Sequence, residues 1–104
     1  MPGAPTYAVV WRDRSDRVCA GRAEIDADAV RLRGRRRDGV VAVDLRYPDL
    51  AAVRIGRSAD ERLDGLPTLV LELRDGGRVL VGGVTGAGTL SELADRLAPH
   101  ARAA

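Results

Sequence analysis

The sequence predicts a mainly β protein, with about seven short antiparallel strands followed by one C-terminal helix. Between residues 7 and 82, apolar and polar residues alternate in short runs, which is the spacing of half-buried strands. Gly, Pro and Asp residues separate these runs, as they do in hairpins. From Thr89 onward the apolar spacing changes to that of an amphipathic helix.

The length of 104 residues suits a single domain with one hydrophobic core. We expect residues 1–6, which are rich in Pro, Gly and Ala, to form a flexible lead-in, and residues 7–104 to form the domain. The N-terminus has neither a basic leader nor a long apolar run, so we expect no signal peptide and no membrane span. The expected location is cytoplasmic, with peripheral attachment to a membrane as the alternative.

The first half of the chain predicts four strands, at residues 7–12, 18–25, 29–33 and 40–47. Alternation places Tyr7, Trp11 and Tyr47, the three aromatic residues, on inward faces. The single cysteine, Cys19, also points inward, which predicts a buried, unreactive thiol. Residues 26–28 form a turn, and residues 34–39 are expected to form a hairpin loop.

The second half predicts strands at residues 52–56, 68–73 and 78–82, with a polar loop at 57–67. Asp75-Gly76-Gly77 is a strong hairpin signal. Thr89 and Glu92 have the spacing of a capping box, and we expect Pro99 to end the helix that follows. The apolar stripe on this helix is predicted to close one end of a curled sheet; it comprises Leu90, Leu93, Ala94, Leu97 and Ala98.

Three stretches resemble the pleckstrin-homology (PH) superfold, especially its GRAM-like and bacterial members. They are residues 21–32 (GRAEI, an acidic turn, then VRL), residues 45–53 (LRYPDLAAV) and the last hairpin at 68–81. The resemblance covers residues 7–102 and implies a seven-stranded antiparallel barrel capped by a C-terminal α-helix. The C-terminal tryptophan and the lysine-dependent lipid motif of eukaryotic members are absent. Because this scaffold hosts lipid-binding, peptide-binding and structural roles, the resemblance does not select among them.

An arginine cluster is the main functional signal, with five arginines in the nine residues RLRGRRRDG at 31–39. In an antiparallel meander the loops after the first and third strands leave the same end. The resemblance adds the last hairpin, residues 74–78, to that end. These loops have net positive charge, which predicts an anion or acidic-partner site formed by Arg14, Arg35, Arg36 and Arg37, with Arg33 at its margin. The alternative is ordinary solvated charge, because all seventeen basic residues of this chain are arginines.

No pattern in the chain indicates catalysis, so we do not expect an enzyme. The only histidine, His100, lies near the C-terminus and is expected to be a frayed surface residue. No two carboxylates are paired by the pattern, and one cysteine with one histidine predicts no metal site. The glycine-rich GGVTGAGT at 82–89 lacks the lysine of a phosphate-binding loop, so we expect a flexible link and no cofactor.

These observations predict a non-enzymatic binding or scaffolding module whose partner is another protein. The alternative is an anionic lipid or phosphate ligand bound at the arginine-rich loops. We do not expect nucleic-acid binding, because all three aromatic residues point inward. Pairing with a second copy or a partner remains open, since an apolar strip is predicted on the sheet exterior; it comprises Ala8, Val10, Val40, Ala42 and Val70.

Overall fold

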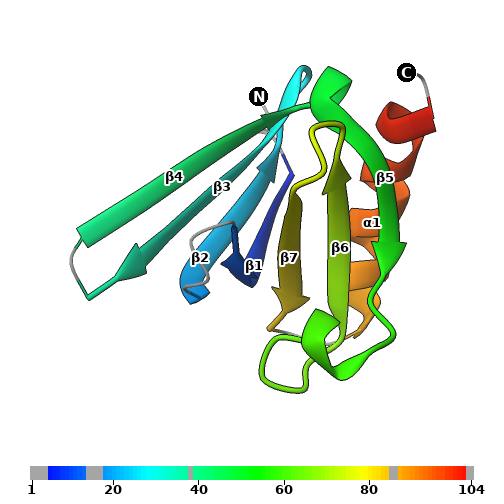
Figure 1. Ribbon diagram of the computed structural model, residues 1–104. Coiled ribbons are helices and arrows are strands. Elements are labelled where there is room, and N and C mark those ends of the chain that lie inside the picture. The colour runs from blue at the N-terminus through cyan, green and yellow to red at the C-terminus, as the bar shows by residue number, and fades with distance from the viewer. Residues whose placement is uncertain (1–4, 14–17, 38, 85–86, 103–104) are drawn as a thin grey trace.

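A computed structural model describes residues 5–13, 18–37, 39–84 and 87–102 of the chain (Figure 1). Within these residues the fold is mainly β, with seven antiparallel strands and one C-terminal helix, so the predicted fold class is confirmed. The strands are β1 (Thr6–Arg12), β2 (Val18–Ile25), β3 (Ala29–Arg36), β4 (Gly39–Arg46), β5 (Leu50–Ile55), β6 (Thr68–Leu73) and β7 (Arg78–Gly83). The helix is α1 (Ala87–Arg102), and two short 3₁₀ helices are η1 (Tyr47–Asp49) and η2 (Ala59–Glu61).

The strands form one sheet in the order β4-β3-β2-β1-β7-β6-β5. The sheet curls into a half-barrel, and β4 and β5 are its two edges (Figure 1). η1 connects these edges, and its Pro48 ends the pairing of β4 as expected. The β3–β4 hairpin projects away from the half of the sheet that carries α1 (Figure 1).

The main core lies between the concave face of the sheet and α1. Alternation turns Tyr7, Val9 and Trp11 of β1 toward it, as predicted. Cys19 is buried there, which confirms its predicted position. The leucine stripe of α1 is buried against β5, β6 and β7. Tyr7 also donates its hydroxyl to Glu92 Oε1 of α1 (3.1 Å), and burial raises the pKa of this phenol, with a further contribution from Glu92.

The helix is longer than predicted at both ends. It begins at Ala87, so Thr89 lies within the first turn and not at the cap, and it continues through Pro99 to Arg102. Pro99 removes one backbone hydrogen bond, but tertiary packing holds the last turn in place. His100 stacks on Tyr47 of η1, with ring centroids 3.6 Å apart and planes 6° from parallel. The expectation that His100 is a frayed surface residue was therefore wrong.

The convex face of β6 and β7 is also covered, by the loop at residues 56–67. Leu63 of this loop packs on Val70 and Leu80, with Val10 at the margin, and forms a second small core. The backbone N–H of Leu63 donates to Thr68 Oγ1 (3.0 Å), which fixes the loop to the start of β6. Val70 is fully buried, so its predicted place in an exposed apolar strip was wrong. Ala8, Val40 and Ala42 are exposed, and Val10 is half-buried.

The carboxylate of Glu61, in η2, anchors the same loop. Glu61 is buried, with 7% of its surface exposed. Oε1 accepts hydrogen bonds from Arg54 Nη1 (3.0 Å) and from the backbone N–H of Arg57 (3.2 Å). Oε2 accepts from Arg78 Nη1 (3.2 Å). The Arg54 hydrogen bond and the Arg57 amide lower the pKa of Glu61 to about 2, and the carboxylates of Glu61 and Glu72 raise the pKa of Arg54.

This pKa predicts a loss of stability in acid. Because folding lowers the pKa of Glu61, the ionised carboxylate stabilises the fold fully above its unfolded-state pKa, about 4.3, and this contribution disappears as the pH falls toward about 2. We expect Glu61→Gln to lower the urea midpoint at pH 7 and to flatten its dependence on pH between about 5 and 2. Glu72→Gln is the matched control, because Arg54 Nε contacts the Glu72 carboxylate at the exposed surface. This substitution should change the urea midpoint and its pH dependence much less. Equal effects of the two substitutions would contradict this assignment.

Candidate functional site

The arginine cluster lies mostly on a strand and not in a loop. Residues 34–39 were predicted to form a hairpin loop, but β3 continues to Arg36 and β4 starts at Gly39. The register pairs Arg35 with Val40 and Arg36 with Gly39, so Arg37 and residue 38 alone connect the strands. Gly39 has φ of 138°, a backbone conformation that suits glycine. The arginines are therefore held by sheet pairing, which limits the directions in which they point.

The structure separates the predicted site residues. Arg33 and Arg35, two residues apart on β3, share the convex face. Arg36 lies on the opposite face of β3 and is half-buried. Arg37 is exposed in the turn, and Arg14 lies outside the described residues. Residues 12 and 18 pair at the ends of β1 and β2, beside the end of β3, so the loops after β1 and β3 leave the same end of the sheet as predicted.

One arginine of this surface was missed from the sequence. Arg22 of β2 lies directly opposite Arg33 in the β2–β3 register, on the same convex face. Alternation already placed it outward, but only charges in loops were counted. Arg22, Arg33 and Arg35, which we call the arginine face, line a shallow hollow of about 490 Å³. Its other lining residues are Ala20, Gly21, Gly34 and Val40.

Two glycines shape this hollow. Gly21 and Gly34 are paired across β2 and β3, and only their backbone atoms line the hollow, because a side chain at either position would point to the concave face. A Cβ on Gly21 would lie 1.9 Å from the carbonyl oxygen of Arg33, so no other residue fits there. A Cβ on Gly34 would lie 3.1 Å from Trp11 Nε1, and that Nε1 donates to the carbonyl oxygen of Arg33 (3.2 Å). The close approach of the strands therefore sets both the floor of the hollow and the position of Trp11.

The electrostatics of the arginine face favour an anionic ligand. Arg22 and Arg33 are like charges in directly opposed positions, which costs free energy unless a counter-charge lies nearby. Glu24 supplies one, because its Oε1 lies 3.0 Å from Arg22 Nε and 3.6 Å from Arg33 Nε. The carboxylate of Glu24 is therefore shared by two guanidinium groups and lies nearest to the Nε of each. None of the described residues lining the hollow is acidic.

The neighbouring arginine behaves differently. Arg31 shares the convex face, but it forms ion pairs with Asp26 and Asp44. It is therefore neutralised within the sheet. The excess positive charge is concentrated farther along β3, at the arginine face and at the exposed Arg37.

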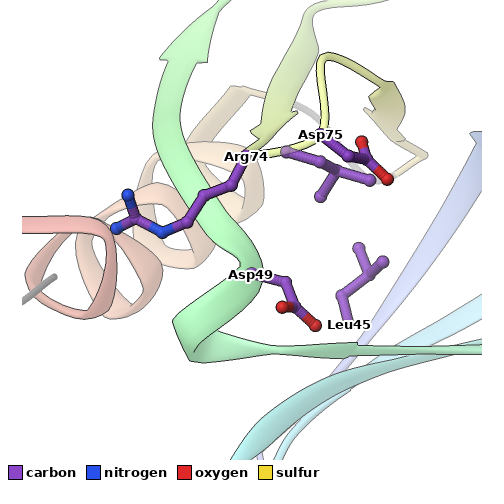
Figure 2. Close-up of a pocket in the computed structure, with 5 residues that line it drawn as sticks. Leu45, Asp49, Arg74 and Asp75 are labelled. Carbon is purple, nitrogen blue, oxygen red and sulfur yellow. The ribbon is translucent and has the colours of Figure 1, made fainter.

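A second hollow, of about 470 Å³, lies between η1 and the β6–β7 turn. Its lining includes Asp49 and Asp75, and Figure 2 shows the Arg74 side chain extending away from both carboxylates. Arg74 donates through Nε to the carbonyl oxygen of Pro48 (2.7 Å), which anchors the β6–β7 turn to η1.

η1 follows the end of β4 farthest from the β3–β4 turn. The register sets Arg12 of β1 opposite Leu80, so the β6–β7 turn leaves the sheet at the same end as the loop after β1, as predicted. The curl of the sheet nevertheless brings this turn against η1, apart from the β3–β4 turn (Figure 1).

The arginine face offers guanidinium N–H donors around a floor formed by the backbone of β2 and β3. Arginine donates hydrogen bonds in a planar fork and does not act as a base at neutral pH. Among the described residues, no three His, Cys, Asp or Glu side chains are grouped to hold a metal ion. In the same residues, no helix is long and apolar enough to cross a membrane. The arrangement is suited to binding carboxylate or phosphate oxygens.

Comparisons with known proteins support the fold. No protein-family model matches the chain, and no curated protein matches it significantly. Among solved structures, the chain is similar to the crystal structure of the C-terminal domain of an unknown protein from Leishmania infantum, with a TM-score of 0.64 and 7% sequence identity. The alignment covers 89% of this chain and 81% of that one. At this identity the likeness concerns the fold alone, a mainly β half-barrel with one C-terminal helix.

Proposed function

We propose that this chain is a non-enzymatic protein-interaction module that binds an acidic segment of a partner protein at the arginine face. The observation that carries the proposal is the hollow lined by Arg22, Arg33 and Arg35, where a single carboxylate, Glu24, faces two of the three guanidinium groups. Bound carboxylates would relieve the repulsion between opposed arginines and gain bidentate hydrogen bonds. The curled sheet with one terminal helix also supports our proposal of a PH-like scaffold.

The shape of the site favours an extended segment over a compact ligand. The hollow is shallow and follows β2, β3 and β4, and Val40 at its margin offers an apolar contact. A strand-like peptide with acidic residues could place carboxylates against the guanidinium groups and apolar side chains against Val40. Affinity is expected to fall as salt concentration rises, because the contacting charges are at the surface.

We expect Arg35→Ala to weaken binding of a fluorescent glutamate-rich decapeptide about tenfold, since hydrogen bonds to charged groups contribute about 1.5–3 kcal/mol each. The combined Arg22→Ala and Arg35→Ala variant should weaken it further. Fluorescence anisotropy at low salt measures both. Arg62→Ala is the matched control, because Arg62 is an exposed arginine in the 56–67 loop and its loss changes net charge equally.

If Arg35→Ala and Arg62→Ala lowered the affinity for the decapeptide equally, net charge alone would explain the effect. That result would contradict a localised site. No binding by the native protein at low salt would remove the proposal altogether.

The second candidate is a phosphate ligand or the headgroups of an anionic lipid. The exposed Val40 (74%) and Val18 (42%) favour it, because apolar side chains beside arginines suit the surface of a bilayer. Sedimentation with phosphatidylserine vesicles separates the two functions. Binding to vesicles without binding to the acidic peptide would replace the protein partner by a lipid surface.

A further inference from the structure

The two edges of the sheet differ in how they are protected from pairing with other strands. At β5, the register is interrupted between Leu50 and Ala52, Pro48 precedes the strand, and α1 packs along it. β4 has none of these protections: it is eight residues long, contains no proline and no register shift, and has extensive contact with β3 alone among the described elements. Long, regular edge strands of this kind pair readily with another strand.

Backbone hydrogen bonds identify which groups of β4 face outward. The N–H of Tyr47 donates to the carbonyl oxygen of Asp28 (3.2 Å), so position 47 faces the β3 side. In an antiparallel ladder, alternate residues direct both their N–H and C=O groups to the same side. The N–H and C=O groups at positions 41, 43 and 45 are therefore directed toward β3. Those of Val40, Ala42, Asp44 and Arg46 face the open edge.

The first five residues of β4 are apolar on both faces of the sheet. Val41 and Val43, on the concave face, are only partly buried against the core, and Val40 on the convex face is 74% exposed. The run from Gly39 to Val43 has no charged residue. Such a strand is better suited to a position between two neighbours than to an edge.

We propose that β4 pairs antiparallel with β4 of a second copy, across a two-fold axis at Val43. In this register Val43 lies opposite Val43 of the second copy, and Val41 lies opposite Leu45, so the concave face pairs apolar residues only. Ala42 lies opposite Asp44, and Val40 lies opposite Arg46. The hydrogen-bonded pairs are then formed by the residues whose N–H and C=O groups face the open edge.

Charge complementarity selects this register. Asp44, whose side chain is 55% exposed, would lie against the small Ala42 of the second copy, and Arg33 is the β3 neighbour of that alanine. Arg33 of the second copy can therefore extend over Ala42 toward Asp44. A two-residue shift that centres the axis on Ala42 would instead place Gly39 opposite Leu45 and lose this apolar contact. The two-fold pairing also joins two arginine faces into one continuous convex surface.

Ala42→Pro tests the pairing, because it removes one outward N–H of β4 and leaves the ladder with β3 intact. Light scattering after size-exclusion chromatography, over a range of concentrations, should give the native protein a mass approaching twice the chain's 11.1 kDa. Ala42→Pro should raise the dissociation constant of the dimer at least about tenfold. Ile55→Pro is the matched control, since it also places a proline on an outward N–H, but on the β5 edge, and should leave the dissociation constant unchanged.

Asp44→Arg is a second variant, at an exposed position, that does not depend on tolerance of proline. It should also raise the dissociation constant, because it places arginine beside Arg33 of the second copy. A native protein that stays at 11.1 kDa at all concentrations would overturn the proposal. So would a dimer that resists Ala42→Pro and Asp44→Arg. The acidic decapeptide, tested on monomeric Ala42→Pro, separates this inference from the proposed function, because each can fail while the other holds.

Discussion

Gly21→Ala should lower the free energy of unfolding by about 3 kcal/mol or more, which is a large share of the stability of a domain of this size. The added Cβ would lie 1.9 Å from the carbonyl oxygen of Arg33 and 2.6 Å from Cα of Gly34. Both are backbone atoms, so no side-chain rotation relieves the overlap. β2 and β3 would have to separate at the centre of their pairing, and the Trp11 hydrogen bond to Arg33 would be strained with them.

Urea unfolding followed by circular dichroism measures this effect. Gly88→Ala is the matched control, because a Cβ there meets nothing within 4 Å and the position lies in α1. That substitution should stabilise the protein by about 0.5–1 kcal/mol, the ordinary helical preference for alanine over glycine. A Gly21→Ala protein as stable as the native one would show that β2 and β3 are not in close contact at this point.

Much of the fold follows from local sequence patterns. Alternation assigned the inward faces of β1 and β2 correctly: Tyr7 and Trp11 of β1 and Cys19 of β2 are all buried. The change to helical spacing also marked α1, although not its ends. Pro99 was expected to stop the helix, but contact between His100 and Tyr47 of η1, far away in the sequence, keeps the last turn helical.

The errors at the site have the same origin. Gly34 looks like a turn residue in the sequence, so residues 34–39 were predicted to be a loop. In the structure Gly34 lies within β3 because Trp11 packs against it, a contact between residues 23 positions apart that no local pattern reveals. Arg35 and Arg36 therefore lie on a strand and point to opposite faces, which divides the predicted cluster.

The curl of the sheet explains the remaining differences. Loop charges predicted an arginine-rich end that includes the last hairpin, and the register does place that hairpin at the same end of the sheet as the loop after β1, but it packs against η1 and not against the β3–β4 turn. Pairing between strands instead brings Arg22 opposite Arg33. Val70 faces the convex side, as alternation indicates, and is buried because the 56–67 loop folds over it. Strand faces could thus be predicted from sequence, whereas the neighbours of each face depend on the path of the chain.

The paired glycines couple the core to the surface. Gly21 and Gly34 allow the strands to approach closely, and their backbone forms part of the floor of the hollow on the convex face. On the concave side the same approach presents the carbonyl oxygen of Arg33 to Trp11. The position of the arginine face therefore depends on the packing of a fully buried aromatic residue, which makes Trp11 the second position where a large effect is expected.

We expect Trp11→Ala to cost about 3–5 kcal/mol of unfolding free energy, the usual effect of removing a large buried aromatic side chain. Trp11 has no exposed surface and contacts the centre of the main core, so its loss leaves a cavity under Gly34. Trp11→Phe should cost less, because a smaller ring still fills much of the space. Its main loss is the hydrogen bond to Arg33, a contribution of about 1 kcal/mol.

Circular dichroism is the suitable probe for both variants, because Trp11 is the only tryptophan and its fluorescence is lost with it. Val40→Ala, at an apolar residue that is 74% exposed, should change stability by no more than about 0.5 kcal/mol. If Trp11→Ala were as mild as Val40→Ala, the indole would not be the centre of the core. Trp11→Phe could also weaken binding of the acidic decapeptide while the sheet stays folded. That result would show that the Nε1 hydrogen bond holds Arg33, and with it the arginine face, in position.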